Sequence, residues 1–533
     1  MKLVIRELRL PLNYKERQIK AEAARALGVE PAAITDLTWL RQSVDARRSR
    51  VCFRFTVMVE LADDTVLSPH IMESPAVAPF KEAQPQALVP GSENLPHPPV
   101  IVGTGPAGLF CGLLLARQGY RPVLIERGQD IDRRVAAVEA FQRDRVLNEN
   151  SNVQFGEGGA GSFSDGKLTT RIGDARVGQV LKTLVEHGAP AEILYQKKAH
   201  VGTDYIRQAV KAMRQSIISL GGEFHFDSRL TDIDIHRARL RGISINGNRE
   251  LPCAVLVLAI GHSARDTCRM LEQKGVAMSP KAFAVGLRVE HPQEVIDRLQ
   301  YGRDAKHPRL PPADYRLTYH EGPGRRSLYT FCMCPGGYVI PCASGAEQTV
   351  TNGMSRFARD SGVANSAVLV TVTPADWTGR LGGIGLQEQL EQRAFRLGGG
   401  DYSAPAQLMT DFLEHRRSSE RGLTQSIATY KPGVVSADLR ELFPAEMAGV
   451  IERGTRAWEK KMPGWISPQA VFTGVESRSS SPLRMERHAG MCSVSLDGLY
   501  PCGEGAGYAG GIVSSAVDGM KAAEAIIRRY ALP

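Results

Sequence analysis

The sequence has no apolar run long enough to cross a bilayer, which argues against an integral membrane protein. Its first residues, MKLVIR, are typical of a charged strand rather than a signal peptide. Cysteine is scarce: there are nine, an odd number, and several such as Cys111 and Cys253 lie in apolar contexts. This favours reduced thiols over a disulfide framework. We therefore expect a cytoplasmic protein without a membrane span.

Acidic residues are fewer than basic ones, 57 against 66, which gives a formal net charge of +9. A positive balance suits an anionic cofactor or substrate, and it also suits nucleic acid. The basic residues are dispersed, however, so a solvated surface is the simpler interpretation and nucleic-acid binding is not favoured. We predict no metal site. The length of 533 residues predicts two or three domains.

A glycine pattern, G-x-G-x-x-G, follows an apolar strand predicted at 100–102. Its first glycine permits a tight turn, its second lets backbone approach a pyrophosphate, and its third lets helix and strand pack closely. A helix predicted at 109–118 then directs its N-terminal N–H groups at the phosphate. The residues of this turn are Gly103, Gly105, Pro106, Ala107 and Gly108.

A second strand, predicted at 122–125, leads to Glu126, 23 residues after Gly103. A carboxylate at this place accepts hydrogen bonds from both ribose hydroxyls of an adenosine and repels a 2′-phosphate. Arg127 follows and is a further candidate contact. Strand, glycine turn, helix and acid together predict a dinucleotide-binding unit.

Residues 1–80 are predicted to form a small α+β domain with the order β-α-β-β, which is half of a ferredoxin-like sheet. The last strand alternates cleanly, with Phe53, Phe55 and Val57 on one face. A packing or partner-docking role is favoured over RNA binding, because paired exposed aromatics are not recognisable. Proline-rich residues 81–97 are predicted to be a linker.

A glycine-rich segment at 148–171 follows a charged helix predicted at 131–146. Its glycines allow backbone to lie close to something flat or charged, and its hydroxyls and amine supply donors to phosphate or to the carbonyl edge of a ring. We expect a second cofactor-contacting segment here. The candidate contacts are Gly159, Gly161, Ser162 and Lys167.

A helix predicted at 205–220 is followed by short strands and by an apolar strand at 253–261 that ends at Gly261. In nucleotide-binding flavoproteins such a strand brings the chain back beneath the cofactor. The backbone near Leu230 is then placed to read the edge of the adenine. This assignment depends on the order of the segments.

Residues 276–489 lack the doubly wound pattern and are predicted to form a substrate or cap domain. Cys332, Cys334 and Cys342 lie in it, but their spacing lacks a fourth zinc ligand, and a disulfide within C-x-C is strained. Buried thiols near a turn are the favoured interpretation. The segment 477–487 gathers three arginines and four serines, which suits either an anionic group or a surface ion-pair cluster.

The C-terminal segment 497–529 repeats the plan of strand, glycine turn and helix. Glu504 is suited to binding a polyol, and the N–H groups at the start of the last helix are suited to a developing negative charge. The candidate contacts in this segment are Gly503, Glu504, Gly510, Gly511 and Ile512.

With these segments in order, the chain resembles the glutathione-reductase-like FAD/NAD(P)-binding superfamily. More closely, it resembles a poorly characterised family of FAD-dependent dehydrogenases with a small N-terminal domain. The motifs QFGEGGAGSFSDGKL, LAIGHSARDT, CPGG, ESRSSSPLR and PCGEGAGYAGGI carry this resemblance over essentially the whole chain. Superfamily members often have Asp where this chain has Glu504.

The resemblance implies an α/β fold: a Rossmann-like FAD-binding domain with a parallel sheet at 98–275 and 490–533, a mixed α+β cap at 276–489, and the ferredoxin-like domain. It implies non-covalent FAD with its ribityl chain near Glu504. A second G-x-G-x-x-G followed by a strand and an acid is missing, so a built-in NAD(P)H domain is not expected, and NAD(P)H is a candidate transient donor.

We therefore expect an FAD-dependent oxidoreductase that transfers hydride at flavin N5 to or from a small, possibly anionic, substrate. Cys334 and His262 are the candidate catalytic residues, and a structural role is favoured for each. Two alternatives stay open: a flavoprotein with a mainly binding role, RNA-associated or docking to a partner, and an isoprenoid or lipid reductase. The oligomeric state does not follow from the sequence.

Overall fold

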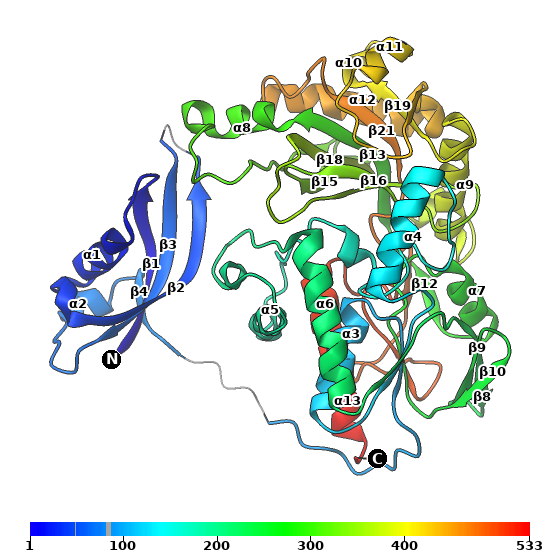
Figure 1. Cartoon of the computed structure of the whole chain (residues 1–533), viewed down its shortest axis with the longest axis horizontal. Coiled ribbons are helices and arrows are strands. Elements are labelled where there is room, and N and C mark those ends of the chain that lie inside the picture. Colours follow the sequence, from blue (N-terminus) through cyan, green and yellow to red (C-terminus); the bar gives the residue numbers. More distant parts are fainter. Residues whose placement is uncertain (48–49, 82–86, 533) are drawn as a thin grey trace.

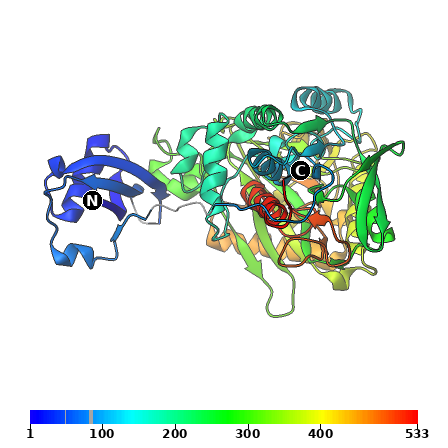
Figure 2. The ribbon, with the colours of Figure 1, turned by 90° about the horizontal axis from the view of Figure 1, so that it is seen from below.

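The computed structural model describes residues 1–47, 50–81 and 87–532, and Figure 1 shows three parts in it. The first is a small N-terminal domain that stands apart in both ribbon views (Figures 1 and 2). The others are a parallel-sheet domain and a cap built on a large mixed sheet. The predicted fold class is confirmed. The predicted linker at 81–97 lies partly outside the described residues.

The N-terminal domain is a four-stranded antiparallel sheet in the order β2-β3-β1-β4. This is the ferredoxin-like order, because β3 lies between the two strands joined by helix α1. Alternate residues of β3 are buried, which places Phe53, Phe55 and Val57 in the core as the alternation predicted. The elements are β1 (Lys2–Pro11), α1 (Glu16–Leu27), β2 (Ile34–Asp45), β3 (Cys52–Leu61), α2 (Pro69–Met72) and β4 (Val77–Pro79).

The second part is a five-stranded parallel sheet in the order β23-β11-β5-β6-β7. Its elements are β5 (Val100–Val102), α3 (Pro106–Arg117), β6 (Val123–Ile125), α4 (Ile131–Asp144), α5 (Arg176–Glu186), α6 (Gly202–Ser219), β7 (Glu223–His225), β8 (Leu230–His236), β9 (Arg239–Ile245), β10 (Arg249–Pro252), β11 (Leu256–Leu258), α7 (Arg265–Gln273), β23 (Leu499–Pro501) and α13 (Ile512–Arg529).

Both faces of the parallel sheet are covered, as such sheets require. Ile101 of β5 packs with helices α3, α5, α6 and α13 on one face. Val100 and Val102 pack on the other face with the small antiparallel sheet of β8, β9 and β10 and with α7. The period of two along β5 thus sorts its side chains between two cores.

Helices α3 and α13 cross closely, although some 400 residues separate them. A Cβ built on Gly519 of α13 would lie 2.0 Å from the carbonyl oxygen of Ala107 in α3. Only glycine permits that approach. The glycine-rich turns that precede these two helices are also neighbours in space, since a Cβ on Gly503 would lie 2.9 Å from the Ala107 Cβ.

The cap is built on a seven-stranded sheet in the order β14-β15-β18-β13-β21-β19-β20, antiparallel except for the last pair. Its central strand β13 is buried over nearly its whole length. The elements are β12 (Met278–Pro280), β13 (Phe283–Pro292), α8 (Gln293–Tyr301), β14 (Thr318–His320), β15 (Ser327–Cys334), β16 (Tyr338–Pro341), β17 (Thr351–Met354), β18 (Val363–Val372), α9 (Gly382–Leu397), β19 (Ala404–Leu408), α10 (Met409–Leu413), α11 (Glu420–Thr424), β20 (Val434–Ser436), α12 (Ala445–Lys461), β21 (Val471–Glu476) and β22 (Leu483–Met485).

A buried ion-pair triad joins the cap to the parallel-sheet domain. Glu391 of α9 lies 2.7 Å from Arg265 of α7 and 2.8 Å from Arg478, which follows β21. Burial opposes the charge of Glu391, but the two guanidinium groups hold the pKa of its carboxyl well below its usual range. Removing one partner would leave an uncompensated buried charge, which costs about 3–5 kcal/mol.

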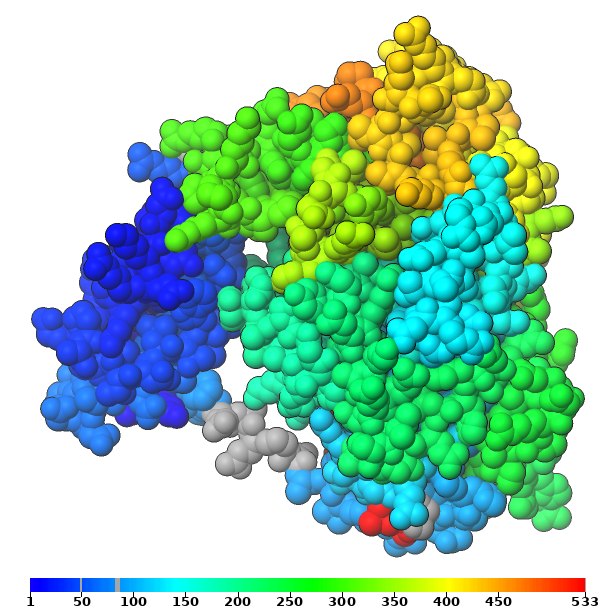
Figure 3. Space-filling model, in the orientation of Figure 1, coloured from blue at the N-terminus to red at the C-terminus, as the bar shows by residue number. Residues whose placement is uncertain are grey.

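The N-terminal domain lies against the main body as a separate lobe (Figure 3). Its edge strand β2 pairs with an extended segment: the Gln42 N–H donates to the Tyr195 carbonyl at 2.7 Å, and the Lys197 N–H donates to the Gln42 carbonyl at 2.9 Å. Arg309, which follows α8 of the cap, stacks its guanidinium over the Tyr14 ring and donates a hydrogen bond to the Tyr14 carbonyl. The domain therefore bridges the other two parts.

Two predicted helices begin earlier than expected. The helix predicted from 109 begins at Pro106, because proline suits the first helical position, where no N–H is required. The helix predicted from 205 begins at Gly202. The helix predicted to 146 ends at Asp144, since Arg145 takes a left-handed conformation with φ 60°.

Among the described residues, no helix is both long and apolar enough to span a membrane.

Candidate functional site

The three positions of the turn after β5 are occupied by glycine for different structural reasons. Gly103 has φ 96°, and a Cβ there would lie 2.4 Å from the Ala259 carbonyl oxygen. A Cβ on Gly108 would lie 1.9 Å from the Gly103 carbonyl oxygen. These two glycines are required by the protein itself, for the turn and for helix packing.

Gly105 is not required in this way. Its φ of −72° and ψ of −175° suit any residue. The nearest described atom to a Cβ built there is the Gly159 Cα, at 3.7 Å, which is ordinary contact. The space in front of Gly105 therefore suits the close approach of a ligand group that a side chain would displace.

The glycine-rich segment meets this turn and the start of the last helix. A Cβ on Gly159 would lie 3.0 Å from the Gly105 Cα, and one on Gly161 would lie 3.2 Å from the Ile512 side chain. A Cβ on Gly503 would lie 2.9 Å from the Ala107 Cβ. Three predicted segments from distant parts of the sequence thus converge at the carboxyl end of the parallel strands, where ligands bind in open α/β sheets.

Two long helices begin at this place, and no described side chain caps either one. Gly105 is the N-cap of α3 and Gly511 that of α13. Gly510 and Gly511 are exposed, and a Cβ on either would have no close contact among the described atoms. Uncapped helix starts offer backbone N–H groups and partial positive charge, which suit the anionic parts of a dinucleotide.

Arg134 of α4 fixes the glycine-rich segment, and sequence reasoning missed it. Its guanidinium is fully buried and donates to five backbone carbonyls. The acceptors are Asn152, Val153, Gly156, Glu157 and Gly159, at 2.6–3.2 Å. A lone arginine in a charged helix gives no signal of this role, because its partners are backbone groups.

Glu126 is buried and accepts four hydrogen bonds from the protein. Thr104 donates its N–H and its hydroxyl to Oε2, both at 2.9 Å. The N–H groups of Gly128 and Gly156 donate to Oε1, both at 3.0 Å. The carboxylate therefore ties the glycine turn to the glycine-rich segment, and ribose hydroxyls would have to share acceptor positions with these donors.

Arg127 and the start of β8 at Leu230 both lie close to this acid. Arg127 pairs with Asp266 at 2.8 Å and stacks on the Phe155 ring at 4.3 Å. Leu230 is buried at the start of β8, and the Ser228 N–H before it donates to the Glu126 carbonyl at 2.8 Å. The backbone near Leu230 is thus held close to Glu126.

His262 and Glu504 meet at the ends of neighbouring strands β11 and β23. The His262 Nδ1 lies 3.1 Å from the Glu504 Oε1, and a Cβ on Gly505 would lie 2.5 Å from the Gly261 carbonyl oxygen. The His262 Nε2 is buried and has no hydrogen-bond partner among the described residues. A buried polar atom without a partner fits a site that a ligand completes.

Two sequence-predicted donors are placed differently from the prediction. The Ser162 side chain is fully buried and its hydroxyl is directed at the Glu157 carbonyl, so it is not presented to a phosphate. The Lys167 amine lies 2.9 Å from Asp165 and donates to the Met333 carbonyl of the cap. Lys167 therefore links the glycine-rich segment to β15, which does not support the phosphate contact predicted for it.

The arginines of 477–487 are mostly committed to buried pairs. Arg478 pairs with Glu391, and Arg487 pairs with Asp518 of α13 at 2.7 Å. Arg484 is exposed, 5.0 Å from the Tyr508 ring centre. Of the two alternatives that the sequence left open, Arg478 and Arg487 fit the ion-pair cluster, but their pairs are largely buried and not at the surface.

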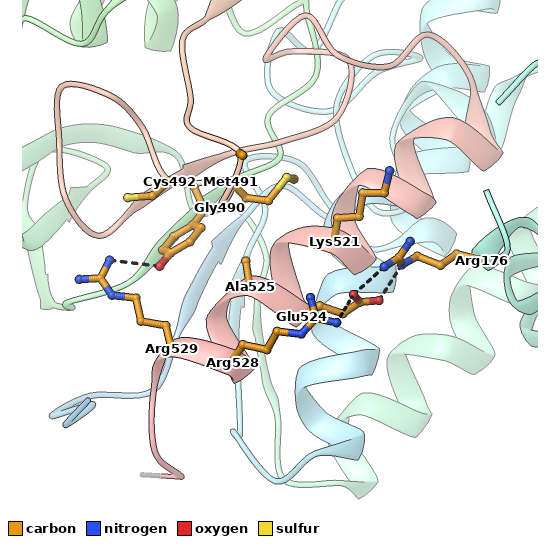
Figure 4. A pocket seen from close by; sticks show the side chains of 11 residues that line it. Arg176, Gly490, Met491, Cys492, Lys521, Glu524, Ala525, Arg528 and Arg529 are labelled. Carbon is orange, nitrogen blue, oxygen red and sulfur yellow. Dashed lines mark hydrogen bonds and ion pairs between the residues drawn. The ribbon is translucent and has the colours of Figure 1, made fainter. Parts of the chain in front are cut away.

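A cavity of about 490 Å³ lies beside the second half of α13, away from these helix starts (Figure 4). It is lined by four basic side chains, but each has an acidic partner. Arg176 and Arg528 pair with Glu524, Lys521 with Asp174 and Arg529 with Asp497. Glu93 also pairs with Arg529, at 2.9 Å, so four acids balance the four basic groups. Within the described residues, no group of three or more His, Cys, Asp or Glu side chains is arranged to hold a metal ion.

Comparisons with known proteins agree with this geometry. Residues 282–479 match the family model "FAD-dependent protein, C-terminal domain-like", and residues 101–144 match an NAD(P)-binding Rossmann-like domain. Residues 1–60 match a domain of unknown function. An uncharacterized protein of Clostridium beijerinckii is 45% identical over 537 residues, covering 100% of both chains.

Solved structures that the chain matches share little sequence with it. A geranylgeranyl bacteriochlorophyll reductase-like protein of Thermoplasma acidophilum is 15% identical, with 81% of this chain and 78% of that chain covered and a TM-score of 0.34. A glycerol-3-phosphate dehydrogenase of Bacillus halodurans, complexed with FAD, is 10% identical, with 81% and 64% covered and a TM-score of 0.34.

The fold and the site define a nucleotide-binding flavoprotein, and its cofactor is FAD. The chain belongs to the family of the Clostridium beijerinckii protein.

Proposed function

We propose that the protein is an FAD-dependent oxidoreductase of the glutathione-reductase-like superfamily, acting on a small-molecule substrate in the cytoplasm. FAD, when bound, supplies hydride chemistry at its N5 atom. The observation that carries the proposal is the convergence of the Gly105 turn, the glycine-rich segment and the start of α13.

The residues divide the cofactor between them. The start of α3 at Gly105 would hold the pyrophosphate through backbone N–H groups, and Glu126 would hold the adenosine ribose. The start of α13, at Gly511 and Ile512, would face the part of the flavin where negative charge develops. This helix of 18 residues would direct its positive end there and stabilise that charge.

His262 is proposed to contact the cofactor through Nε2. Its Nδ1 faces the Glu504 carboxylate at 3.1 Å, which favours the tautomer with a proton on Nδ1 and leaves Nε2 as an acceptor. Because the Glu504 side chain remains 28% exposed, it is also accessible to a polyol. This pair is proposed to hold the ribityl chain.

The test is an anaerobic screen in which bleaching of the flavin absorbance reports hydride transfer. The purified protein is mixed with nicotinamides, 2-hydroxy acids and other small alcohols and amines, and the reduced protein is then mixed with candidate acceptors. Gly105→Val, expected to lack FAD, is the matched control. Turnover with a donor and an acceptor supports the proposal. An FAD-loaded protein that no donor reduces would favour a binding role instead.

A further inference from the structure

Lys281 and Arg484 lie on one face of a two-stranded ribbon formed by β12 and β22. The strands are antiparallel, and Ser279 lies opposite Arg484. The pairing continues for one step beyond β12, since the Lys281 N–H donates to the Pro482 carbonyl at 2.8 Å. Residues two apart on a strand share a face, so Lys281 is the diagonal neighbour of Arg484, at a distance of about 7–8 Å that long side chains can span.

The two faces of this ribbon differ in character. Met278, Leu483 and Met485 are buried in the same core as strands β5 and β11 of the parallel sheet. On the other face Lys281 is half-buried and Arg484 is exposed. The apolar side chains therefore anchor the ribbon and leave the two cations directed away from the core.

The ribbon also lies against the loop that leads into α13. The Met485 N–H donates to the Ala506 carbonyl at 3.1 Å. A Cβ on Gly507 would lie 3.0 Å from the Arg484 Cα, and the Arg484 guanidinium lies 5.0 Å from the centre of the Tyr508 ring. Arg484 is thus held beside the uncapped start of the last helix.

The charges of these two side chains are uncompensated in the part of the chain that the structure describes. The Lys281 amine and the Arg484 guanidinium form no hydrogen bond or ion pair with any described residue. The acid on the same face, Glu486, accepts a hydrogen bond from the Ser279 hydroxyl instead. Two neighbouring cations repel each other, and an anion between them removes this repulsion.

Lys281 also lies near the proposed ribityl contact, Glu504. Burial lowers the pKa of the Lys281 amine, Glu504 opposes this shift and Arg484 adds to it, which agrees with three neighbouring charges. The Glu504 carboxylate itself is directed at His262, 3.1 Å away. The two cations therefore stand beside the proposed cofactor, whereas its pyrophosphate is assigned to the turn at Gly105.

We propose that Lys281 and Arg484 together bind the anionic group of the substrate, a carboxylate or a phosphate, beside the flavin. The guanidinium is suited to donating two parallel hydrogen bonds to such a group, and the ammonium adds a point charge. This inference rests on the proposed FAD-dependent function and names the class of its substrate.

The experiment maps the two side chains chemically in the FAD-loaded protein. Phenylglyoxal modifies accessible arginines and acetic anhydride accessible amines, and peptide mapping by mass spectrometry gives the rate at each residue. The probes are inorganic phosphate and succinate, each compared with sodium chloride at the same ionic strength. We expect Lys281 and Arg484 to be protected with a common half-protecting concentration, and the exposed Lys306 and Arg325 to be unaffected. Protection by phosphate, by succinate or by both identifies the group that is bound.

Variants test whether the two cations act together. In Lys281→Met, protection of Arg484 should require about five- to tenfold more anion, and in Arg484→Met the protection of Lys281 should shift likewise. The reason is that a half-buried site gains more from each cation than the roughly two- to fivefold of an exposed ion pair. Lys306→Met is the matched control and should leave both protections unchanged. The FAD content and circular dichroism of each variant report folding.

Protection no greater than that by sodium chloride would overturn the site, because it would show screening alone. Protection seen only after FAD is removed would assign the cations to the cofactor and overturn a substrate site. Unchanged protection of each residue in the other's variant would overturn their joint action. The proposed function fails separately, when an FAD-loaded protein that shows the protection is reduced by no donor.

Discussion

Gly159 lies against Gly105, such that a Cβ on Gly159 would come within 3.0 Å of the Gly105 Cα. The contact brings the glycine-rich segment onto the turn before α3. Unlike Gly103 and Gly108, Gly105 has a backbone conformation and packing that other residues could also adopt. This difference separates ligand binding from folding and can be tested.

Gly105→Ala should leave the melting temperature of the FAD-free protein unchanged while weakening FAD retention, and Gly105→Val should abolish retention. The added carbon occupies the approach of the pyrophosphate. Gly103→Ala is the matched control and should lower stability, because it forces φ 96° on alanine and a 2.4 Å contact. Flavin content and thermal unfolding measure both effects. Full flavin in a folded Gly105→Val protein would contradict the proposed cofactor position.

Glu126→Ala should weaken FAD binding by about 1–3 kcal/mol through the loss of an acceptor for the ribose. Because four protein donors also lose their acceptor, the melting temperature should fall as well. Titration of FAD into the stripped protein and thermal unfolding separate the two losses. A variant with lower stability but unchanged affinity would show that Glu126 serves only to join the loops.

Deletion of residues 1–80 should leave FAD bound and lower the stability. The described contacts of the N-terminal domain are with residues such as Tyr195, Asp304 and Arg309, none of which belongs to the converging glycine segments. We expect the loss of stability because the deletion would expose the Tyr195 ring, whose centre lies 5.2 Å from that of Trp39. A truncated protein that folds without flavin would place the domain in the cofactor site.

Reduction by NADH or NADPH should be slow, or should saturate only at high concentration. The sequence shows one dinucleotide fingerprint, which we propose holds FAD, so each missing charge-assisted contact should weaken nicotinamide binding roughly 10- to 150-fold. Arg484→Ala should weaken it further if the exposed guanidinium contributes, whereas the exposed Arg325→Ala is the control. Stopped-flow reduction over a concentration series measures this. Tight, micromolar saturation with one nicotinamide would show a dedicated second site.

The stability should depend on pH through Glu290. Burial raises the pKa of its carboxyl to about 7, from 4.5, and its Oε2 has no hydrogen-bond partner among the described residues. A raised pKa in the folded state gives stability that is complete below about 4.5 and is lost as the pH rises through about 7. Glu290→Gln should therefore raise the unfolding free energy by about 1–3 kcal/mol at pH 8 and little at pH 5.

Chemical denaturation at the two pH values measures this difference. Glu294→Gln, on the exposed side of α8, is the control. An equal effect of Glu290→Gln at both pH values would contradict the assignment.

Local patterns predicted the parts of this molecule that depend on local physics. The glycine turn, the strand that leads to Glu126 and the alternation of β3 were all readable, because backbone freedom and burial leave a period in the sequence. Arg134 was not, since its partners are carbonyls that every residue carries. Lys167 was predicted to donate to a phosphate or to the carbonyl edge of a ring, because its neighbours in sequence suggested such a site, whereas it contacts β15, 166 residues away. Contacts between distant segments leave no such period.

The parallel sheet receives β23 as its edge strand next to β11, and α13 packs on α3. Strand β11 and helix α3 are synthesised first, and their partners β23 and α13 follow more than 200 residues later. During translation, the turn at Gly105 is therefore made long before the helix that faces it. The cofactor site cannot be complete on the ribosome while residues 499–529 are still missing. Acquisition of FAD should therefore require synthesis to have passed residue 529, and a nascent chain stalled before residue 499 would expose one edge of the sheet and one apolar face of α3 to chaperones.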